Sequence, residues 1–198
     1  AKPIRDGALA IDEVNDHDSL INEIYAACKL QMIEADTTIS EAGLGQFEIN
    51  LVHSLDEMKA ADDAAFFKQI VRGVARRYGV AASLMAKPYA DRPGNGMHLH
   101  ISLLDGKGKN VFDDGSDGGS PILGHALAGA LAGLADSMLI FAPHQNSYRR
   151  FAIESYAPMA VCWGYENRTA ALRVPLGPPS QRRVEHRVSG ADANPYLV

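Results

Sequence analysis

The sequence has few of the features that would place it outside an ordinary globular protein. Its only cysteines, Cys28 and Cys162, have no spacing typical of a metal knuckle. No apolar run approaches the roughly 18 to 20 residues that span a bilayer, and residues 1–5 lack the apolar core of a signal peptide. A formal net charge of -5 gives no basic surface for nucleic acid. We therefore expect a cytoplasmic protein with no membrane or nucleic-acid partner.

The composition supports a packed core. Of the 198 residues, 46% are hydrophobic and 22% charged, which is typical of a soluble globular domain, and one lobe is favoured over two. The chain starts without an initiator Met and stops after Leu197-Val198 without an obvious closing element. We therefore expect residues 1–198 to be a truncated domain.

Periodicity and turn residues predict the order of the elements. Residues 1–16 read as an irregular lead-in. A capping box at Ser54–Glu57 should start a helix that ends at Gly79. The remaining expectations are a helix from Asp18 or Ser19 through Cys28, β structure over 37–51, a buried strand over 80–85, a loop over 86–94, a turn at 105–110 and a small-residue helix over 124–141.

The most informative stretch is residues 94–103, G-N-G-M-H-L-H-I-S-L. In a strand, His98, His100 and Ser102 share one face, while Leu99, Ile101 and the other apolar side chains share the opposite, core face. A solvent-facing polar stripe is the simpler interpretation of such a pattern. Because neutral imidazole binds transition metals and hydrogen-bonds phosphate, the strand is also a candidate wall of a metal or nucleotide site.

Two carboxylates upstream are candidate ligands for a hard divalent cation. Glu41 and Glu48 are seven residues apart, which puts them on opposite faces of a regular strand. Gly43 and Gly45 indicate a bend that redirects the side chains, so both carboxylates can converge on magnesium or manganese. The alternative is a pair of exposed acids at a strand edge.

Arginine replaces lysine in the second half of the chain. No lysine follows Lys109, whereas seven arginines occur after it, at 149, 150, 168, 173, 182, 183 and 187. The planar guanidinium suits bidentate recognition of phosphate and carboxylate, although two or three of the seven are expected to form ordinary salt bridges. Arg183, Glu185 and Arg187 alternate along an apparent strand, which is a sensible arrangement for a metal ligand between phosphate-binding cations.

With these residues identified, the chain resembles the catalytic domain of the glutamine synthetase family from about Ile33 to its last residue. Residues 1–32 are then a lead-in and helix, and 33–198 the matching core. The matching blocks are E-A-G-L-G-Q-F-E at 41–48, K-P at 87–88, G-N-G-M-H-L-H-I-S at 94–102, N-S-Y-R-R at 146–150, N-R-T-A-A-L-R-V-P at 167–175, R-R-V-E-H-R at 182–187 and D-A-N-P-Y at 192–196. The resemblance implies an α+β fold with a curved, mainly antiparallel sheet flanked by helices.

The resemblance also implies site residues and a reaction. The γ-carboxylate of glutamate would attack ATP to give an acyl phosphate, and an amine would displace phosphate, with no side-chain nucleophile. The implied metal ligands for Mg²⁺ or Mn²⁺ are Glu41, Glu48, His98 and Glu185. Nucleotide contacts would be His100, Ser102, Arg173 and Arg183, transition-state contacts Arg168 and Arg150, and glutamate contacts Gly94, Arg150 and Arg187.

The chain departs from the family pattern at the amine site. Ammonia-using members carry a Glu directly before the flap Ala-Pro, where this chain has Tyr156. An aromatic face can pack on an alkyl amine or make a cation–π contact. Together with W-G-Y-E-N-R-T at 163–169, this favours the γ-glutamylpolyamine or γ-glutamylputrescine synthetase branch and a polyamine or alkyl amine acceptor. Glu154 taking over the role would restore the ammonia-dependent alternative.

The family has a metal-binding E-x-E strand ahead of the matching segment, and no such strand is found in residues 1–36. The N-terminal lobe and the C-terminal helices of the family are likewise not evident, so the chain by itself is expected to be inactive. The resemblance implies that the parent protein forms a large homo-oligomeric ring. A non-catalytic metal- or nucleotide-binding member of the family is one alternative function. Another carboxylate–amine ligase or a guanidino kinase is a further alternative, which the number of matching blocks disfavours.

Overall fold

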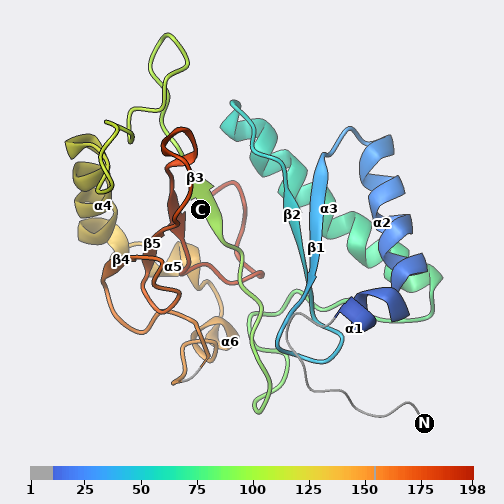
Figure 1. Ribbon diagram of the computed structural model, residues 1–198. Helices are drawn as coiled ribbons and strands as arrows, with labels where there is room; N and C mark the ends of the chain where they lie inside the picture. The colour runs from blue at the N-terminus through green and yellow to red at the C-terminus, as the bar shows by residue number, and fades with distance from the viewer. Residues whose placement is uncertain (1–10, 154) are drawn as a thin grey trace. The chain divides into compact units, whose positions relative to one another are not determined.

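The computed structural model describes residues 11–153 and 155–198, which fall into two units (Figure 1). Unit 1 contains the described residues up to Leu84, together with 91–93 and 194–196. Unit 2 contains 85–90, 94–193 apart from residue 154, and 197–198. No helix in the described part of the chain is long and apolar enough to cross a membrane.

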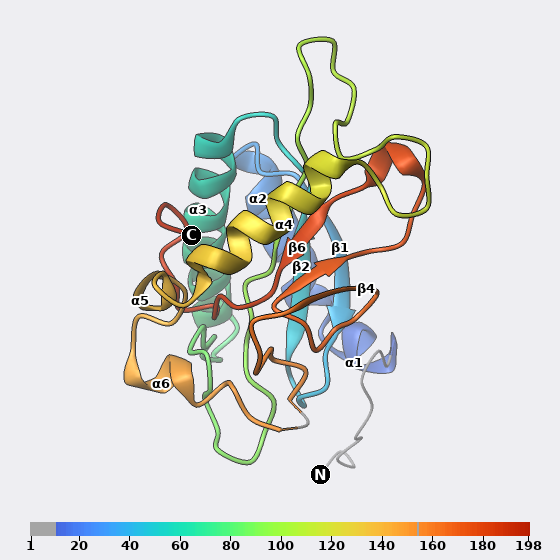
Figure 2. The ribbon, with the colours of Figure 1, turned by 90° about the vertical axis from the view of Figure 1, so that its left-hand side faces the viewer.

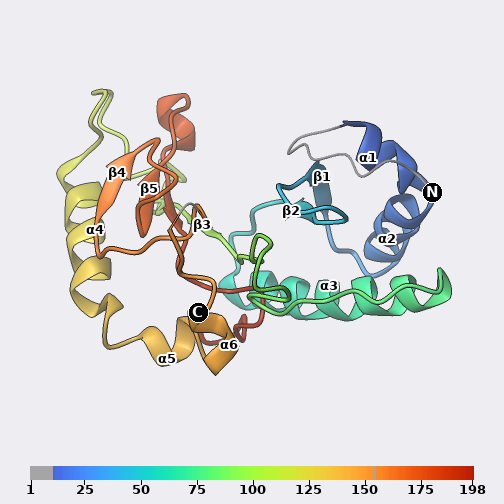
Figure 3. The same ribbon diagram turned by 90° about the horizontal axis from the view of Figure 1, so that it is seen from below.

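Unit 1 is a β-hairpin packed against helices. Its elements are α1 (Ile11–Asp16), α2 (Asp18–Leu30), β1 (Ala35–Ser40), β2 (Phe47–Leu51) and α3 (Glu57–Arg77). The strands pair antiparallel, with Ser40 opposite Phe47. Figure 3 shows α3 running along one side of this hairpin. The core between hairpin and helices contains Ile24, Cys28, Ile33, Ile70 and Val74.

The helix ends in unit 1 correct two expectations and confirm one. Residues 11–16 are helical and not an irregular lead-in, while residues 1–10 lie outside the described part. Asp56, not Ser54, caps α3, because its carboxylate accepts hydrogen bonds from the N–H groups of residues 58 and 59. Gly79 ends the helix as expected, with φ of 70°.

The buried strand expected over 80–85 is wrong. Val80 N–H bonds to Ala75 O and Gly79 N–H to Arg76 O, the pair of bonds that closes a Schellman motif. Val80 therefore belongs to the cap of α3. The segment has no strand, and Val80 and Met85 are about half exposed.

Unit 2 is built on a four-stranded sheet in the order β3-β6-β5-β4. The strands are β3 (Leu99–Ile101), β4 (Trp163–Tyr165), β5 (Leu172–Val174) and β6 (Val184–His186). β6 pairs antiparallel with β3 and β5, and β4 pairs parallel with β5. The remaining elements are α4 (Pro121–Leu134), α5 (Met138–Phe141), α6 (Gln145–Tyr148) and a 3₁₀ turn at Pro179–Gln181. The expected α+β fold with mainly antiparallel strands is confirmed.

Helix α4 covers one face of this sheet (Figure 2). Phe112, Leu123 and Leu127 pack there against Leu172, Val174 and Val184. The single helix expected over 124–141 is wrong at its start and is interrupted, although its end at Phe141 agrees with α5. Pro121 starts α4 three residues earlier, with Ser120 as N-cap, and the chain turns at 135–137 before α5.

The loop and turn expectations between α3 and α4 hold. Residues 86–94 form a loop, and the turn at 105–110 is closed by bonds from Asp105 N to Lys109 O and from Gly108 N to Asp105 O. The apolar face of the His strand is less buried than expected, because Ile101 and Leu103 are 47% and 45% exposed at the end of β3. Burial is concentrated on β5 and β6.

Candidate functional site

The face of the unit 2 sheet opposite α4 carries a row of polar side chains. The register pairs His100 on β3 with Glu185 on β6, and Glu185 with Arg173 on β5. Residues directly opposite one another in a sheet project to the same face, so these three side chains form one row. The neighbours Leu172 and Val184 project to the other face, toward α4. The two-faced strand predicted from the H-x-H alternation is therefore present.

Glu185 lies at the centre of this row. Its Oε1 lies 2.5 Å from Arg187 Nη1 and 3.3 Å from His98 Nδ1, and its Oε2 lies 2.7 Å from Arg173 Nη1. The side chain is only 3% exposed. Burial raises the pKa of Glu185, but the hydrogen bond from His98 and the charges of Arg187 and Arg173 outweigh it and lower the pKa to about 2. The carboxylate is therefore ionised at neutral pH.

The two histidines have different partners. Burial lowers the pKa of His98 despite the nearby Glu185 carboxylate, so the ring is neutral and donates Nδ1–H to Glu185. His98 Nε2 then keeps its lone pair. His100 Nδ1 accepts a hydrogen bond from Arg183 Nε at 2.9 Å, and burial lowers the pKa of His100 to about 4. Both rings have the protonation state that a metal or phosphate ligand needs.

Several of the seven arginines donate hydrogen bonds to backbone carbonyls. Buried Arg150 donates to the carbonyls of Val188 and Arg187, at 2.8 and 3.0 Å. Burial lowers the pKa of Arg150 to about 10. Arg182 donates both Nη groups to the carbonyls of residues 116 and 117, at 2.9 Å each. The expectation that this set serves anion recognition is therefore wrong for the Arg182 guanidinium, which binds a loop.

The other predicted site residues surround the same part of unit 2. Arg187 Nε donates to the carbonyl of Arg168 at 3.1 Å, and its Nη2 to the carbonyl of Tyr156 at 3.4 Å. The side chains of Arg168 and Tyr156 are exposed. Ser102 Oγ donates to the Arg182 carbonyl at 3.1 Å. A Cβ at Gly94 would lie 2.4 Å from Ala86 O, so this position has no room for a side chain.

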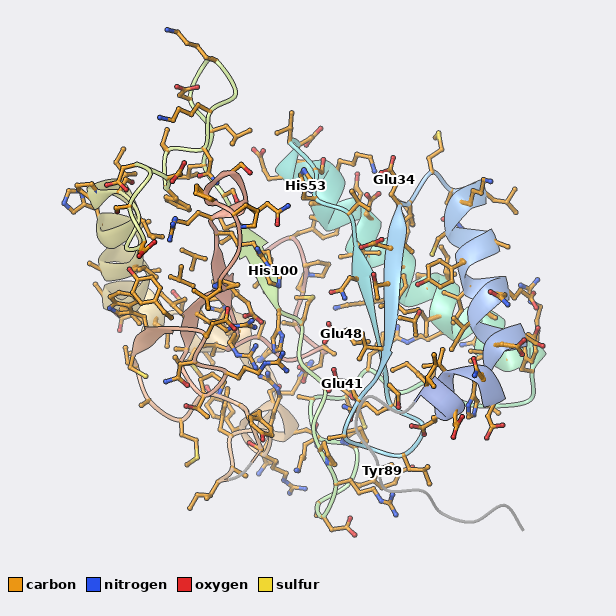
Figure 4. All side chains as sticks on the ribbon, viewed as in Figure 1. Glu34, Glu41, Glu48, His53, Tyr89 and His100 are labelled. Atoms are coloured by element: carbon orange, nitrogen blue, oxygen red, sulfur yellow. The ribbon has the colours of Figure 1, made fainter. Side chains whose placement is uncertain are left out.

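Glu41 and Glu48 lie on the same face of the hairpin in unit 1. Their spacing along a single strand does not explain this. Ile39 pairs with Glu48, and Glu41 N–H bonds to Gln46 O across the turn. Glu41 therefore projects to the same face as Gln46 and Glu48. Figure 4 shows both carboxylates on the side of the hairpin away from α2. The turn between two strands, and not a bend within one, brings them to one face.

Each unit by itself supplies only part of the ligand set that a hard divalent cation needs. Unit 2 offers an ionised carboxylate, Glu185, and a neutral imidazole, His98, and unit 1 offers the Glu41 and Glu48 carboxylates. Within the residues described, no group of three or more His, Cys, Asp or Glu side chains is placed to hold a metal. Metal ligation by these four residues thus stays a prediction.

Two contacts in unit 2, one of them with a predicted site residue, were not singled out from the sequence. Glu166 Oε2 lies 3.3 Å from Arg173 Nη2. Asn146 binds the Lys87 backbone twice, accepting from its N–H at 2.9 Å and donating to its carbonyl at 2.8 Å. The K-P and N-S-Y-R-R blocks contain Lys87 and Asn146, but the sequence did not indicate that these two residues pair. No local pattern signalled the Glu166 contact.

Comparison with known proteins matches residues 2–198 to the model of the glutamine synthetase catalytic domain. The γ-glutamylputrescine synthetase of Escherichia coli (strain K12) is 46% identical over 96% of the chain and 40% of its own length. The glutamate–isopropylamine ligase of a Pseudomonas species is 39% identical over 92% of the chain and 41% of its own length.

A solved GmaS/ADP complex superposes with a TM-score of 0.86 and 30% identity, covering 99% of the chain and 46% of that protein. The chain thus spans about 40% of the length of the curated relatives it matches. A family model that covers almost the whole chain, together with the same fold in a solved relative, assigns the chain to a family. The chain belongs to the glutamine synthetase family and matches its catalytic domain.

Proposed function

We propose that the protein containing this chain is an ATP-dependent ligase that joins the γ-carboxylate of glutamate to a polyamine or alkyl amine. A γ-carboxylate oxygen attacks the γ-phosphorus of ATP, which releases ADP and gives γ-glutamyl phosphate. The amine nitrogen then attacks the acyl carbon, phosphate leaves and the nitrogen loses a proton. Membership of the family and the likeness to two glutamate–amine ligases support this class of reaction.

The polar face of unit 2 supplies the charge that such a reaction needs. Arg173 and Arg183, with His100 and Ser102, are assigned to the nucleotide phosphates because they lie along adjacent strands of this face. Preorganised guanidinium groups stabilise the charge that develops on a transferring phosphoryl group. Arg168, whose side chain is exposed, is assigned to the stabilisation of the same transferring phosphoryl group.

Glu185 and His98 would hold one Mg²⁺ or Mn²⁺, and Glu41 and Glu48 would hold another. Such cations, when bound, neutralise charge on the nucleotide phosphates. Glu185 is suited to this role because its pKa of about 2 keeps it ionised. Arg187, which contacts the Glu185 carboxylate, and Arg150, which donates to the Arg187 carbonyl, are assigned to the glutamate carboxylates with the Gly94 backbone.

The observation that supports an amine acceptor is Tyr156. Its side chain is 66% exposed, its φ is 53°, and its carbonyl accepts a hydrogen bond from Arg187. A Tyr where ammonia-using members have a carboxylate removes a negative charge from the ammonium site and adds an aromatic face. An alkyl ammonium group gains packing or a cation–π contact from the aromatic face, whereas ammonium, which has no alkyl group to pack, only loses its counter-charge.

Two other functions differ in measurable ways. In the ammonia-dependent alternative, Glu154 supplies the missing carboxylate; this residue lies outside the described part of the chain. In a non-catalytic member, nucleotide binds without turnover. The presence together of Glu41, Glu48, His98 and Glu185 argues against a decayed site, since drift would erode such a set.

The test is ADP release by the complete protein with ATP, glutamate and a panel of amines. We expect putrescine or a monoamine to give faster turnover than ammonia at equal concentration. Tyr156→Glu should raise the rate with ammonia relative to that with amines, and Tyr156→Phe, which keeps the aromatic face, should leave the preference unchanged. Faster turnover with ammonia in the unaltered protein would contradict the proposed acceptor.

A further inference from the structure

Glu166 occupies a constrained position at the end of β4. Its φ of 51° lies in the left-handed region, which few residues other than glycine adopt. Its N–H donates to Val174 O at 3.1 Å and continues the parallel pairing of β4 with β5. The sheet therefore fixes the Glu166 backbone beside the last residues of β5.

The Glu166 carboxylate contacts the chain on both sides of that strand end. Its Oε1 accepts a hydrogen bond from Leu176 N–H, and its Oε2 lies 3.3 Å from Arg173 Nη2. The Leu176 hydrogen bond, with the Arg173 charge, lowers the pKa of Glu166 below its ordinary value. Glu166 is therefore an anchored anion at neutral pH.

Arg173 thus lies between two carboxylates. Its Nη1 is 2.7 Å from Glu185 Oε2, while its Nη2 contacts Glu166. Its buried Nε has no hydrogen-bond partner among the residues described. The orientation of the guanidinium plane consequently depends on the two Nη contacts.

Glu185 alone is a poor anchor for this plane. It also contacts Arg187 and His98, and it is one of the residues assigned to the metal. A cation on Glu185 would compete with Arg173 for the same oxygens. Glu166 lies outside this competition because its other oxygen is held by a backbone N–H.

Resting on the proposed function, we propose that Glu166 is a positioning residue that holds the Arg173 guanidinium toward the nucleotide phosphates. Glu166 acts through Arg173 and does not touch the reacting atoms. Its side chain is 40% exposed, so its ion pair contributes little to stability. Its removal should change nucleotide affinity more than folding.

The test compares the complete protein with its Glu166→Gln variant by calorimetric titration of ADP in the presence of Mg²⁺. Glutamine keeps an oxygen for Leu176 N–H but removes the charge that holds Arg173. We expect the Kd for ADP to rise about five- to tenfold, the size expected for one charge-assisted contact. The KM for glutamate should change less than about twofold, and the Tm by less than about 2 °C.

Asp105→Asn is the matched control. Asp105 is also an exposed carboxylate that accepts backbone N–H groups, from residues 107 and 109, but its contacts lie in the 105–110 turn. It should leave the Kd for ADP unchanged. In an Arg173→Lys background, Glu166→Gln should have little further effect, because the two residues act as a unit.

An unchanged Kd in Glu166→Gln, or fully additive effects in the double variant, would overturn the proposal. Equal losses of affinity for ADP and glutamate with a lower Tm would also overturn it, because they indicate a general structural defect. ADP binding without amine-dependent turnover in the unaltered protein would contradict the ligase function alone, and the Glu166 comparison would still be decided by the Kd values.

Discussion

Arg187 Nη1 lies 2.5 Å from Glu185 Oε1, and both side chains are less than a tenth exposed. Removing one partner of a buried pair leaves the other charge uncompensated. We expect Glu185→Gln to lower the free energy of unfolding by about 3 kcal/mol, measured by urea denaturation. Glu23→Gln, which removes the carboxylate from the exposed pair with Arg77, should cost less than about 1 kcal/mol. Similar losses in both variants would contradict the central place of Glu185.

Metal binding can be read from thermal stability. Manganese should raise the Tm of the unaltered protein, because a ligand that binds only the folded state stabilises it. The increase should shrink in Glu41→Ala and His98→Ala. It should persist in Glu34→Ala, a carboxylate at the other end of the same hairpin (Figure 4). Equal increases in all four proteins would show that the assigned ligands are wrong.

The glycines before the His strand differ in what surrounds them. A Cβ at Gly94 would meet Ala86 O at 2.4 Å, whereas one at Gly96 would meet the side chains of Arg150 and His98 at 2.8 and 2.9 Å. Backbone yields less easily than side-chain ends, so Gly94→Ala should lower the Tm more. Gly96→Ala should chiefly weaken metal and glutamate binding, because it displaces His98 and Arg150.

Gly129→Ala provides the reference for these substitutions. It lies in α4 with nothing within 4 Å of the added Cβ, and should stabilise by up to about 1 kcal/mol through helix propensity. Thermal denaturation of the three variants gives the order. A Gly96→Ala protein with a larger Tm loss than Gly94→Ala would contradict the packing described.

His186 should make stability depend on pH. Its ring packs on Phe141 with centroids 4.4 Å apart, and burial, followed by the charges of His98 and Arg150, lowers its pKa to about 4. Between the unfolded value near 6.5 and 4, the unfolded chain takes up a proton that the folded protein does not. Stability from this group is therefore complete above about pH 7 and falls as the pH falls through that window.

The measurement is chemical denaturation of the unaltered protein and His186→Leu at pH 7.5 and pH 5. The variant should lose about 1–2 kcal/mol less on acidification, because it lacks the group whose protonation favours unfolding. Parallel losses in the two proteins would show that His186 does not contribute to the acid sensitivity.

The local alternation of residues was sufficient to predict which side chains share a face on the His strand and on β6. Their alternation depends only on residue order, so the shared face of His98, His100 and Glu185 with its arginines follows from the sequence once the strands pair. The carboxylates of unit 1 needed more information. Whether Glu41 and Glu48 share a face depends on the turn that sets Ser40 opposite Phe47, and this register is not contained in the spacing of two residues along one strand.

The partners of charged side chains could not be predicted in the same way. Arg182 and Arg183 are adjacent and chemically identical, yet one donates to loop carbonyls and the other to His100. Their opposite directions follow from strand alternation, but what lies in each direction is set by segments about 65 and 83 residues away. Val80 shows the same limit, because its apolar side chain reads as strand while its N–H closes a helix cap.

The most direct test of the proposed ligase is a competition for product. The complete protein is incubated with ATP, glutamate, Mg²⁺ and equal concentrations of putrescine, a monoamine and ammonium, and products are quantified by mass spectrometry. A γ-glutamyl amine exceeding glutamine, with one ADP formed per amide, is the predicted result. Glutamine as the main product would contradict the assignment of Tyr156 to an alkyl amine site, and ADP formation without any amide would contradict the ligase function.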